Sequence, residues 1–153
     1  GCCGMNFDYL ARKPFWDRGL DFNHGTGHGV GYLLNIHEGP AGFRYTYRAG
    51  ESDAFQPGMV ITDEPGIYIE GSHGVRLENE LLVCEGEKNE YGQFLHFEII
   101  TLIPFDLDAI NPDIMNAEDK ERLNTYHATV YEKVSPYLND EEKEWLKKYT
   151  RAI

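Results

Sequence analysis

The segment between residues 22 and 104 constrains the fold most strongly, because glycine and proline divide it into short runs rich in Val, Ile, Tyr and Thr. These runs are GMVITDE, GIYIE, VRLENELLVC and FEIITLI. β-Branched and aromatic residues bounded by turn-forming residues are typical of strands. The segment therefore predicts strands of an antiparallel sheet joined by turns.

Helices are predicted on both sides of this segment. Apolar residues recur at helical spacing within residues 6–20, where Pro14 is expected to kink or end the helix. After Pro104, capping patterns begin two further helices, one at Asn116 and one at Asn139. We therefore expect an α+β fold in which residues 1–104 carry the strands and residues 105–153 form a helical tail.

Composition excludes several classes of function. The chain carries 14 basic and 26 acidic residues, a net charge of −12, so nucleic acid and anionic membrane surfaces are poor partners. No apolar run approaches the ~20 residues that a membrane helix needs, and no signal peptide is recognisable. The three cysteines form no CxxC pair, which argues against a disulfide framework or a zinc knuckle. A reducing, cytoplasmic location is the expectation.

Three of the six histidines lie in NHGTGHGVGYLLNIHEGP, residues 23–40. The glycines do not match the dinucleotide fingerprint, and no GK[ST] follows for a phosphate loop. His24 and His28 have the spacing of helical zinc motifs, yet each intervening glycine would cost a helix about 1 kcal/mol. In a strand His24, Thr26 and His28 share one face, and the glycines permit close backbone approach on the other. Buried structural histidines and a metal site both remain possible on this pattern.

The downstream segment VITDEPGIYIEGSHGVRLENELLV adds two carboxylates to this pattern. Glu64 ends an apolar strand and precedes Pro65, which favours extended backbone. Glu78 follows on a strand that could lie beside Glu64. An acid in an apolar strand is costly unless it is paired or metal-bound, and a surface ion pair of Glu78 with Arg76 is the alternative. One imidazole and two carboxylates suit Mn, Co, Zn or Fe(II).

The motifs HGTGHGVG, NIHEGP, TDEPGIYIEGSHGVRLEN and HFEIITLIPFDLDAI together resemble those of the Xaa-Pro aminopeptidases. That family belongs to the pita-bread superfamily, with prolidase, creatinase and methionine aminopeptidase. The resemblance implies the C-terminal half of a pita-bread (creatinase-like) catalytic fold, with antiparallel strands, a flanking helix and a helical C-terminal tail. Residues 105–153 are similar to the extension of the longer family members.

The resemblance also implies a site. His28, Glu64 and Glu78 match three of five protein ligands of two divalent ions, with manganese expected and cobalt or zinc as alternatives. The other two ligands are aspartates that have no counterpart here, so we expect the isolated chain to be inactive.

Four more residues match the family's active site. His37 corresponds to a catalytic, substrate-contacting histidine that stabilises the reacting carbonyl. His24 corresponds to a residue lining the pocket for proline, and Tyr68 to a substrate-binding residue. Arg76 is expected among the catalytic residues in an orienting role.

The function implied is hydrolysis of the bond between an N-terminal residue and a following proline, by a homo-oligomer, expected to be a dimer. The partner is then a peptide with proline at its second position. A prolidase-type dipeptidase and a non-catalytic pita-bread binding module are the alternatives. The helical tail favours the aminopeptidase, and retention of His28, Glu64 and Glu78 disfavours the binding module.

Overall fold

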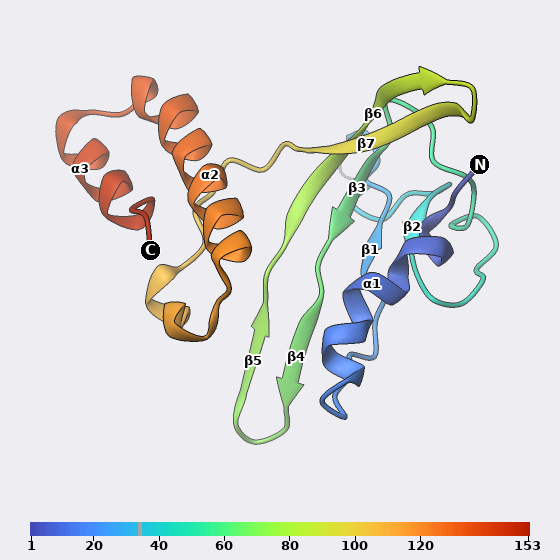
Figure 1. Ribbon diagram of the computed structural model, residues 1–153, viewed down its shortest axis with the longest axis horizontal. Coiled ribbons are helices and arrows are strands. Elements are labelled where there is room, and N and C mark those ends of the chain that lie inside the picture. The colour runs from blue at the N-terminus through green and yellow to red at the C-terminus, as the bar shows by residue number, and fades with distance from the viewer. Residues whose placement is uncertain (34) are drawn as a thin grey trace. The chain divides into compact units, whose positions relative to one another are not determined.

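The structure, a computed structural model, describes residues 1–33 and 35–153. It divides into two compact units, Gly1–Thr101 and Leu102–Ile153 (Figure 1). The elements of the first unit are α1 (Gly4–Trp16), β1 (Gly27–His28), β2 (Gly42–Phe43), β3 (Val60–Asp63), β4 (Gly66–Ile69), β5 (His73–Arg76), β6 (Asn79–Asn89) and β7 (Gly92–Ile99). This order of one helix followed by strands agrees with the α+β prediction.

All strand pairs among the named strands are antiparallel, as predicted. β6 lies between β3 and β7, with Ile61 opposite Leu81 and Val83 opposite Phe97. β4 and β5 form a separate hairpin, in which Gly66 lies opposite Arg76. β1 pairs with the short β2, and Gly29 makes a further bridge to Ile61 of β3. The histidine-bearing segment is thereby placed directly beside β3.

The run predicted as one strand from residue 75 to residue 84 is divided in the structure. β5 ends at Arg76 and β6 begins at Asn79, so the two strands belong to different sheets. Pro65 lies opposite this break, on the segment between β3 and β4. Proline has no backbone N–H to donate to a neighbouring strand. The hydrogen-bonded pairing is therefore interrupted at the level of Glu64 and Glu78.

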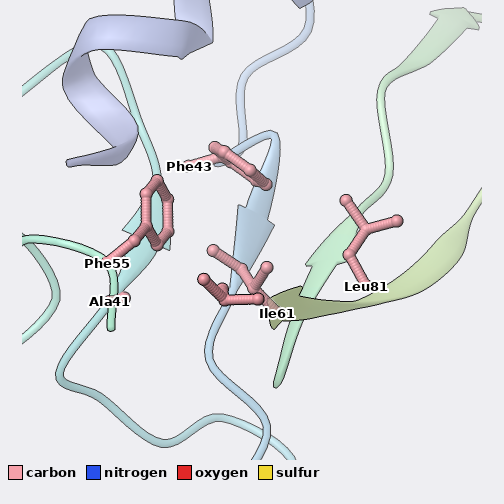
Figure 2. Close-up of a cluster of buried hydrophobic side chains, with 6 residues drawn as sticks. Ala41, Phe43, Phe55, Ile61 and Leu81 are labelled. Carbon is pink, nitrogen blue, oxygen red and sulfur yellow. The ribbon is translucent and has the colours of Figure 1, made fainter. Parts of the chain in front are cut away.

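A hydrophobic cluster packs β2, β3 and β6 of the first unit together (Figure 2), and Phe97 of β7 packs against it. Its buried members are Ala41, Phe43, Phe55, Ile61, Leu81 and Val83. The rings of Phe43 and Phe55 lie 5.4 Å apart, and Phe55 meets Phe97 edge-on at the same centroid distance. Because Ile61 is fully buried in this cluster, the end of β3 and the residues that follow it are held in a fixed position.

The second unit is helical. Its elements are the short 3₁₀ turns η1 (Leu107–Ala109), η2 (Pro112–Ile114) and η3 (Ser135–Tyr137), and the helices α2 (Ala117–Val134) and α3 (Asp140–Tyr149). Both predicted caps are present: Asn116 accepts from the Asp119 amide at 2.8 Å, and Asn139 accepts from the Glu142 amide at 3.0 Å. No helix in the described part of the chain is long and apolar enough to cross a bilayer.

Candidate metal centre

A buried ion pair on α1 anchors the chain that leads to the histidines. The Nε of Arg12 donates to Asp8 at 2.6 Å, one turn earlier, and both side chains are almost completely buried. The same guanidinium donates to the carbonyls of Phe22 at 2.7 Å and His24 at 2.6 Å. Asp8 also accepts from the Thr26 hydroxyl at 2.7 Å. Residues 22–26 are therefore held against the helix, a contact that the sequence did not predict.

The predicted extended backbone is present at Gly27–Gly29, whereas His24 and Thr26 lie in bends, so the strand face predicted for His24, Thr26 and His28 is not formed. The Glu64 amide donates to the Thr26 carbonyl at 2.7 Å, and the Val30 amide donates to the Val60 carbonyl at 3.1 Å. A Cβ at Gly27 would lie 1.7 Å from the Thr62 carbonyl oxygen, which no side chain could tolerate. Glycine at this position therefore allows the close approach of β1 to β3.

His28 and Glu64 come together at the end of these two segments. The Nε2 atom of His28 lies 3.3 Å from Oε1 of Glu64, and both side chains are about nine-tenths buried. The Thr62 hydroxyl links the pair: it accepts from the His28 amide at 3.0 Å and donates to Oε1 of Glu64 at 2.9 Å. Three residues on two adjacent segments thus hold one imidazole against one carboxylate.

The donor set of this pair fits a cation. Nδ1 of His28 contacts the Gly29 carbonyl at 3.0 Å, and since a carbonyl only accepts, Nδ1 carries the hydrogen of the neutral ring. Nε2 then presents a lone pair to the carboxylate of Glu64, which also only accepts. A hydrogen bond to the second ring nitrogen is the usual way in which proteins orient a metal-binding imidazole. A cation between Nε2 and Oε1 would satisfy both atoms.

An ion pair and two hydrogen bonds connect Glu64 to His24. Nη1 of Arg76 lies 3.3 Å from Oε2 of Glu64, and Nε of Arg76 donates to the Tyr68 hydroxyl at 2.8 Å. The Tyr68 hydroxyl lies 3.0 Å from Nε2 of His24. The hydrogen bond to Tyr68 raises the pKa of Arg76; burial opposes this, and the charges of Tyr68, Glu64 and Glu78 raise it further. The arginine is therefore a fixed positive charge beside both predicted carboxylate ligands.

The structure brings together two of the three predicted metal ligands. Glu64 is buried, whereas Glu78 is exposed. Among residues 1–33 and 35–153, the ligand atoms of His28, Glu64 and Glu78 do not form a group within 4.8 Å of one another. Glu78 nevertheless lies close enough for its charge to act on Arg76.

The other predicted site residues lie around this pair. The ring of His37 lies 4.1 Å from that of His28, centroid to centroid. Both rings line a cavity of about 100 Å³, together with Gly29, Glu38, Arg44, Arg48 and Glu51. His24 lines a second cavity, of about 210 Å³, whose wall includes Phe22, Tyr45 and two arginines. The cavity beside His24 is thus lined by both aromatic and charged side chains.

Thr62 and Asp63, which precede Glu64 on β3, were not predicted as site residues. Burial raises the pKa of Asp63, and the neighbouring Glu64 charge raises it further. The motif TDEPG carries these residues, but a hydroxyl and an acid in a strand give no distinctive signal. The role of Thr62 becomes visible only when β1 lies beside β3 and the His28 amide donates to its hydroxyl.

The fold and the site define the class of protein: the chain belongs to metallopeptidase family M24, which it matches over residues 1–85. Residues 93–153 match the C-terminal region of peptidase M24. The predicted resemblance is confirmed.

Individual relatives are closely similar. The chain is 40% identical to the probable Xaa-Pro aminopeptidase P of Colletotrichum graminicola and 43% identical to aminopeptidase P1 of Arabidopsis thaliana, in both cases over all of its length. It spans only 25% and 24% of those two proteins, about a quarter of each.

A solved structure agrees with these relatives. The chain superposes on an X-prolyl aminopeptidase from Caenorhabditis elegans, described as a cytosolic enzyme with a di-nuclear active site, with a TM-score of 0.87 and 36% identity. The match covers all of this chain and 25% of that protein. The predicted pita-bread class of fold is confirmed.

Proposed function

We propose that this chain is part of a dinuclear-metal aminopeptidase that hydrolyses the peptide bond between an N-terminal residue and a following proline. One observation carries the proposal: in the M24 family fold, Nε2 of His28 and Oε1 of Glu64 face each other at 3.3 Å with both side chains largely buried. We infer the reaction from the names of relatives in three organisms. The substrate is then a peptide with proline at its second position.

His28 and Glu64 would hold a divalent ion through these two atoms, and Glu78 would join them as the third ligand from this chain. Bound ions supply Lewis acidity toward the substrate carbonyl and make water reactive at neutral pH. Imidazole and carboxylate suit manganese, which we propose as the metal, with cobalt and zinc as alternatives. The two aspartate ligands of the family have no counterpart among these 153 residues.

The remaining residues orient this centre and the substrate. Arg76 holds Oε2 of Glu64 at 3.3 Å, so that Oε1 stays directed toward His28. Tyr68 fixes Arg76 through its hydroxyl and connects it to His24, on the wall of the pocket proposed for the proline ring. His37 lies beside His28 with its ring tilted by 41°, and it is exposed, so its imidazole is free to contact a reacting carbonyl and stabilise the charge that develops there.

Two alternative functions can be separated from this one. A prolidase-type dipeptidase would use the same metal ligands, but the match of residues 93–153 to the C-terminal region of peptidase M24 favours the longer aminopeptidases. A non-catalytic binding module would have no need of an imidazole and a carboxylate clamped by Thr62 and Arg76. The clamped pair therefore supports an enzyme.

A cytoplasmic location is part of the proposal. Cys2, Cys3 and Cys84 carry free thiols, which suits a reducing compartment. The C. elegans relative is described as cytosolic.

The experiment uses a protein that contains this chain together with the family's two aspartate ligands, loaded with Mn²⁺. We expect it to release the N-terminal residue from Xaa-Pro tripeptides and longer peptides, and to leave matched Xaa-Ala peptides uncut. Cleavage of Xaa-Pro dipeptides alone would identify a prolidase. Metal binding without cleavage of either series would support the binding module and contradict the proposal.

A further inference from the structure

A second cluster of metal-ligating side chains lies on the hairpin of β6 and β7. Cys84 of β6 lies directly opposite His96 of β7 in the antiparallel register, and Glu98 follows two residues later on the same face. The sulfur, one imidazole nitrogen and one carboxylate oxygen all lie within 4.8 Å of one another. Nε2 of His96 is 3.5 Å from Oε1 of Glu98.

This cluster lies on the sheet face that does not contribute to the core. Val83 and Phe97 neighbour it along the two strands and point to the opposite face, where they join the hydrophobic cluster. Cys84 is half-buried, while His96 and Glu98 are exposed. A cation could therefore reach the three ligands from solvent.

The imidazole of His96 lies near a glycine of β6. Gly86 is the next residue of β6 on this face, and a Cβ there would lie 3.6 Å from Nδ1 of His96 and only 3.2 Å from the Phe94 carbonyl oxygen. The regular register extends from Leu81 to Glu85 and shifts only between Glu85 and Lys88. The three ligands thus sit on regularly paired strands, which hold their backbones before any ion binds.

The chemistry of the three ligands selects a class of ion. A thiolate, an imidazole and a carboxylate together suit Zn²⁺ or Co²⁺ better than Ca²⁺ or Mg²⁺, which prefer oxygen alone. Tetrahedral zinc with bonds of about 2.0–2.3 Å separates its ligands by roughly 3.3–3.8 Å, and the His96–Glu98 distance of 3.5 Å fits that range. We propose that Cys84, His96 and Glu98 form a second metal site that binds Zn²⁺ with three protein ligands, separate in its residues from the His28–Glu64 centre.

The Cys84 thiol has to lose its proton in order to bind an ion. Burial raises the pKa of Cys84, and the charge of Glu98 and a hydrogen bond to it raise it further. A protonated thiol is a poor nucleophile, which disfavours a redox role for this cysteine. Binding of Zn²⁺ would displace the thiol proton, so the affinity should increase with pH.

The test uses the whole 153-residue chain, reduced, freed of metal with a chelator and titrated with Co²⁺. Cobalt bound to a thiolate gives a near-ultraviolet charge-transfer band that imidazole and carboxylate ligands alone do not give. We expect this band in the parent chain, its loss on adding Zn²⁺, and its absence in Cys84→Ser. His96→Ala and Glu98→Gln should weaken Co²⁺ binding by about 10²-fold or more, since each removes a ligand.

Matched variants separate this site from the other thiols and from the candidate metal centre. Cys3→Ser removes another half-exposed thiol, Glu87→Gln another acid of β6, and His28→Ala a ligand of the candidate centre; all three should keep the band. Circular dichroism establishes that each variant is folded. A band that survives Cys84→Ser, or a saturated chain without any band, would overturn the proposal. Cobalt binding that gives no sulfur band and disappears with His28→Ala would overturn it as well.

Discussion

Nε2 of His28 and Oε1 of Glu64 lie 3.3 Å apart at the end of two neighbouring segments, with the Thr62 hydroxyl bonded to both residues. Neither ligand atom holds a hydrogen when the ring is neutral, because Nδ1 of His28 donates to the Gly29 carbonyl. The backbone approach at Gly27, the core around Ile61 and the Thr62 hydroxyl all serve to keep this pair together. A pair built in this way is suited to a cation.

Thr62 supplies the first prediction. Thr62→Val keeps the shape of the side chain, but it removes an acceptor from the His28 amide and a donor from Glu64. Leaving these groups unpaired should lower the free energy of unfolding by about 2–4 kcal/mol. Thr62→Ser retains the hydroxyl and loses one methyl group, which costs about 1 kcal/mol. Urea unfolding of the two variants checks this, and equal losses would show that the hydroxyl does not matter.

The two ion pairs of α1 give a matched comparison. Arg12 and Asp8 are buried, whereas Lys13 and Asp17, with the same spacing on the same helix, are exposed. Arg12→Met leaves a buried carboxylate without its partner and should cost about 3–5 kcal/mol. Lys13→Met should leave the unfolding midpoint unchanged, because exposed pairs contribute little. Thermal unfolding followed by circular dichroism distinguishes the two, and a stable Arg12→Met chain would contradict the anchoring role given to Arg12.

His127 predicts a pH dependence in the second unit. It is fully buried and accepts from the Phe105 amide at 3.0 Å through Nε2, while Nδ1 has no partner among the described residues. Burial lowers the pKa of His127, and the charge of Arg151 lowers it further. The unfolded chain then takes up a proton first as the pH falls, so stability should decrease as the pH drops through about 6.5 and below.

His127→Gln removes the titrating group and can still accept from Phe105. In this variant the loss of stability between about pH 7 and pH 5 should be smaller than in the parent. Trp145 reports on the second unit by its fluorescence once Trp16 has been replaced by Phe. Parallel pH profiles for the two chains would show that His127 does not contribute.

An exposed aromatic cluster predicts self-association. The ring of Trp16 lies 6.1 Å from Tyr9 and 6.5 Å from Tyr45, and all three side chains are exposed. Clustered apolar groups on a surface commonly mark an interface, so we expect a concentration-dependent dimer. Trp16→Glu should shift the chain toward monomer in sedimentation experiments. Tyr137→Glu, at an exposed tyrosine of the second unit, should leave the dimer unchanged. A parent chain that stays monomeric at high concentration would contradict the prediction.

Local signals predicted much of the fold. The caps at Asn116 and Asn139 act within one helical turn, so both helices begin where the sequence indicates. The glycines between His24 and His28 excluded a helix there for an equally local reason. The break between β5 and β6 was not predicted. Pro65, which interrupts the hydrogen-bonded pairing, lies between β3 and β4 and not within residues 75–84 themselves.

The site was only partly predictable for a related reason. Glu64 and His28 were identified from motifs, but their clamps come from other strands: Thr62 of β3 bonds to His28, and Arg76 of β5 holds Glu64. The cluster of Cys84, His96 and Glu98 was passed over because no CxxC pair is present. Its members meet only through the register of β6 and β7, which depends on the length of the turn between those strands.

The central claim is that His28 holds metal while the neighbouring His37 acts on the substrate. The most direct measurement is metal content beside turnover of an Xaa-Pro peptide, for His28→Ala and His37→Ala in a protein that also carries the family's two aspartates. His28→Ala should lose metal and activity together. His37→Ala should keep its metal and lose about 10²-fold or more in turnover, as expected when a group that stabilises developing charge is removed. If His37→Ala lost metal as fully as His28→Ala, the roles assigned to the two histidines would be wrong.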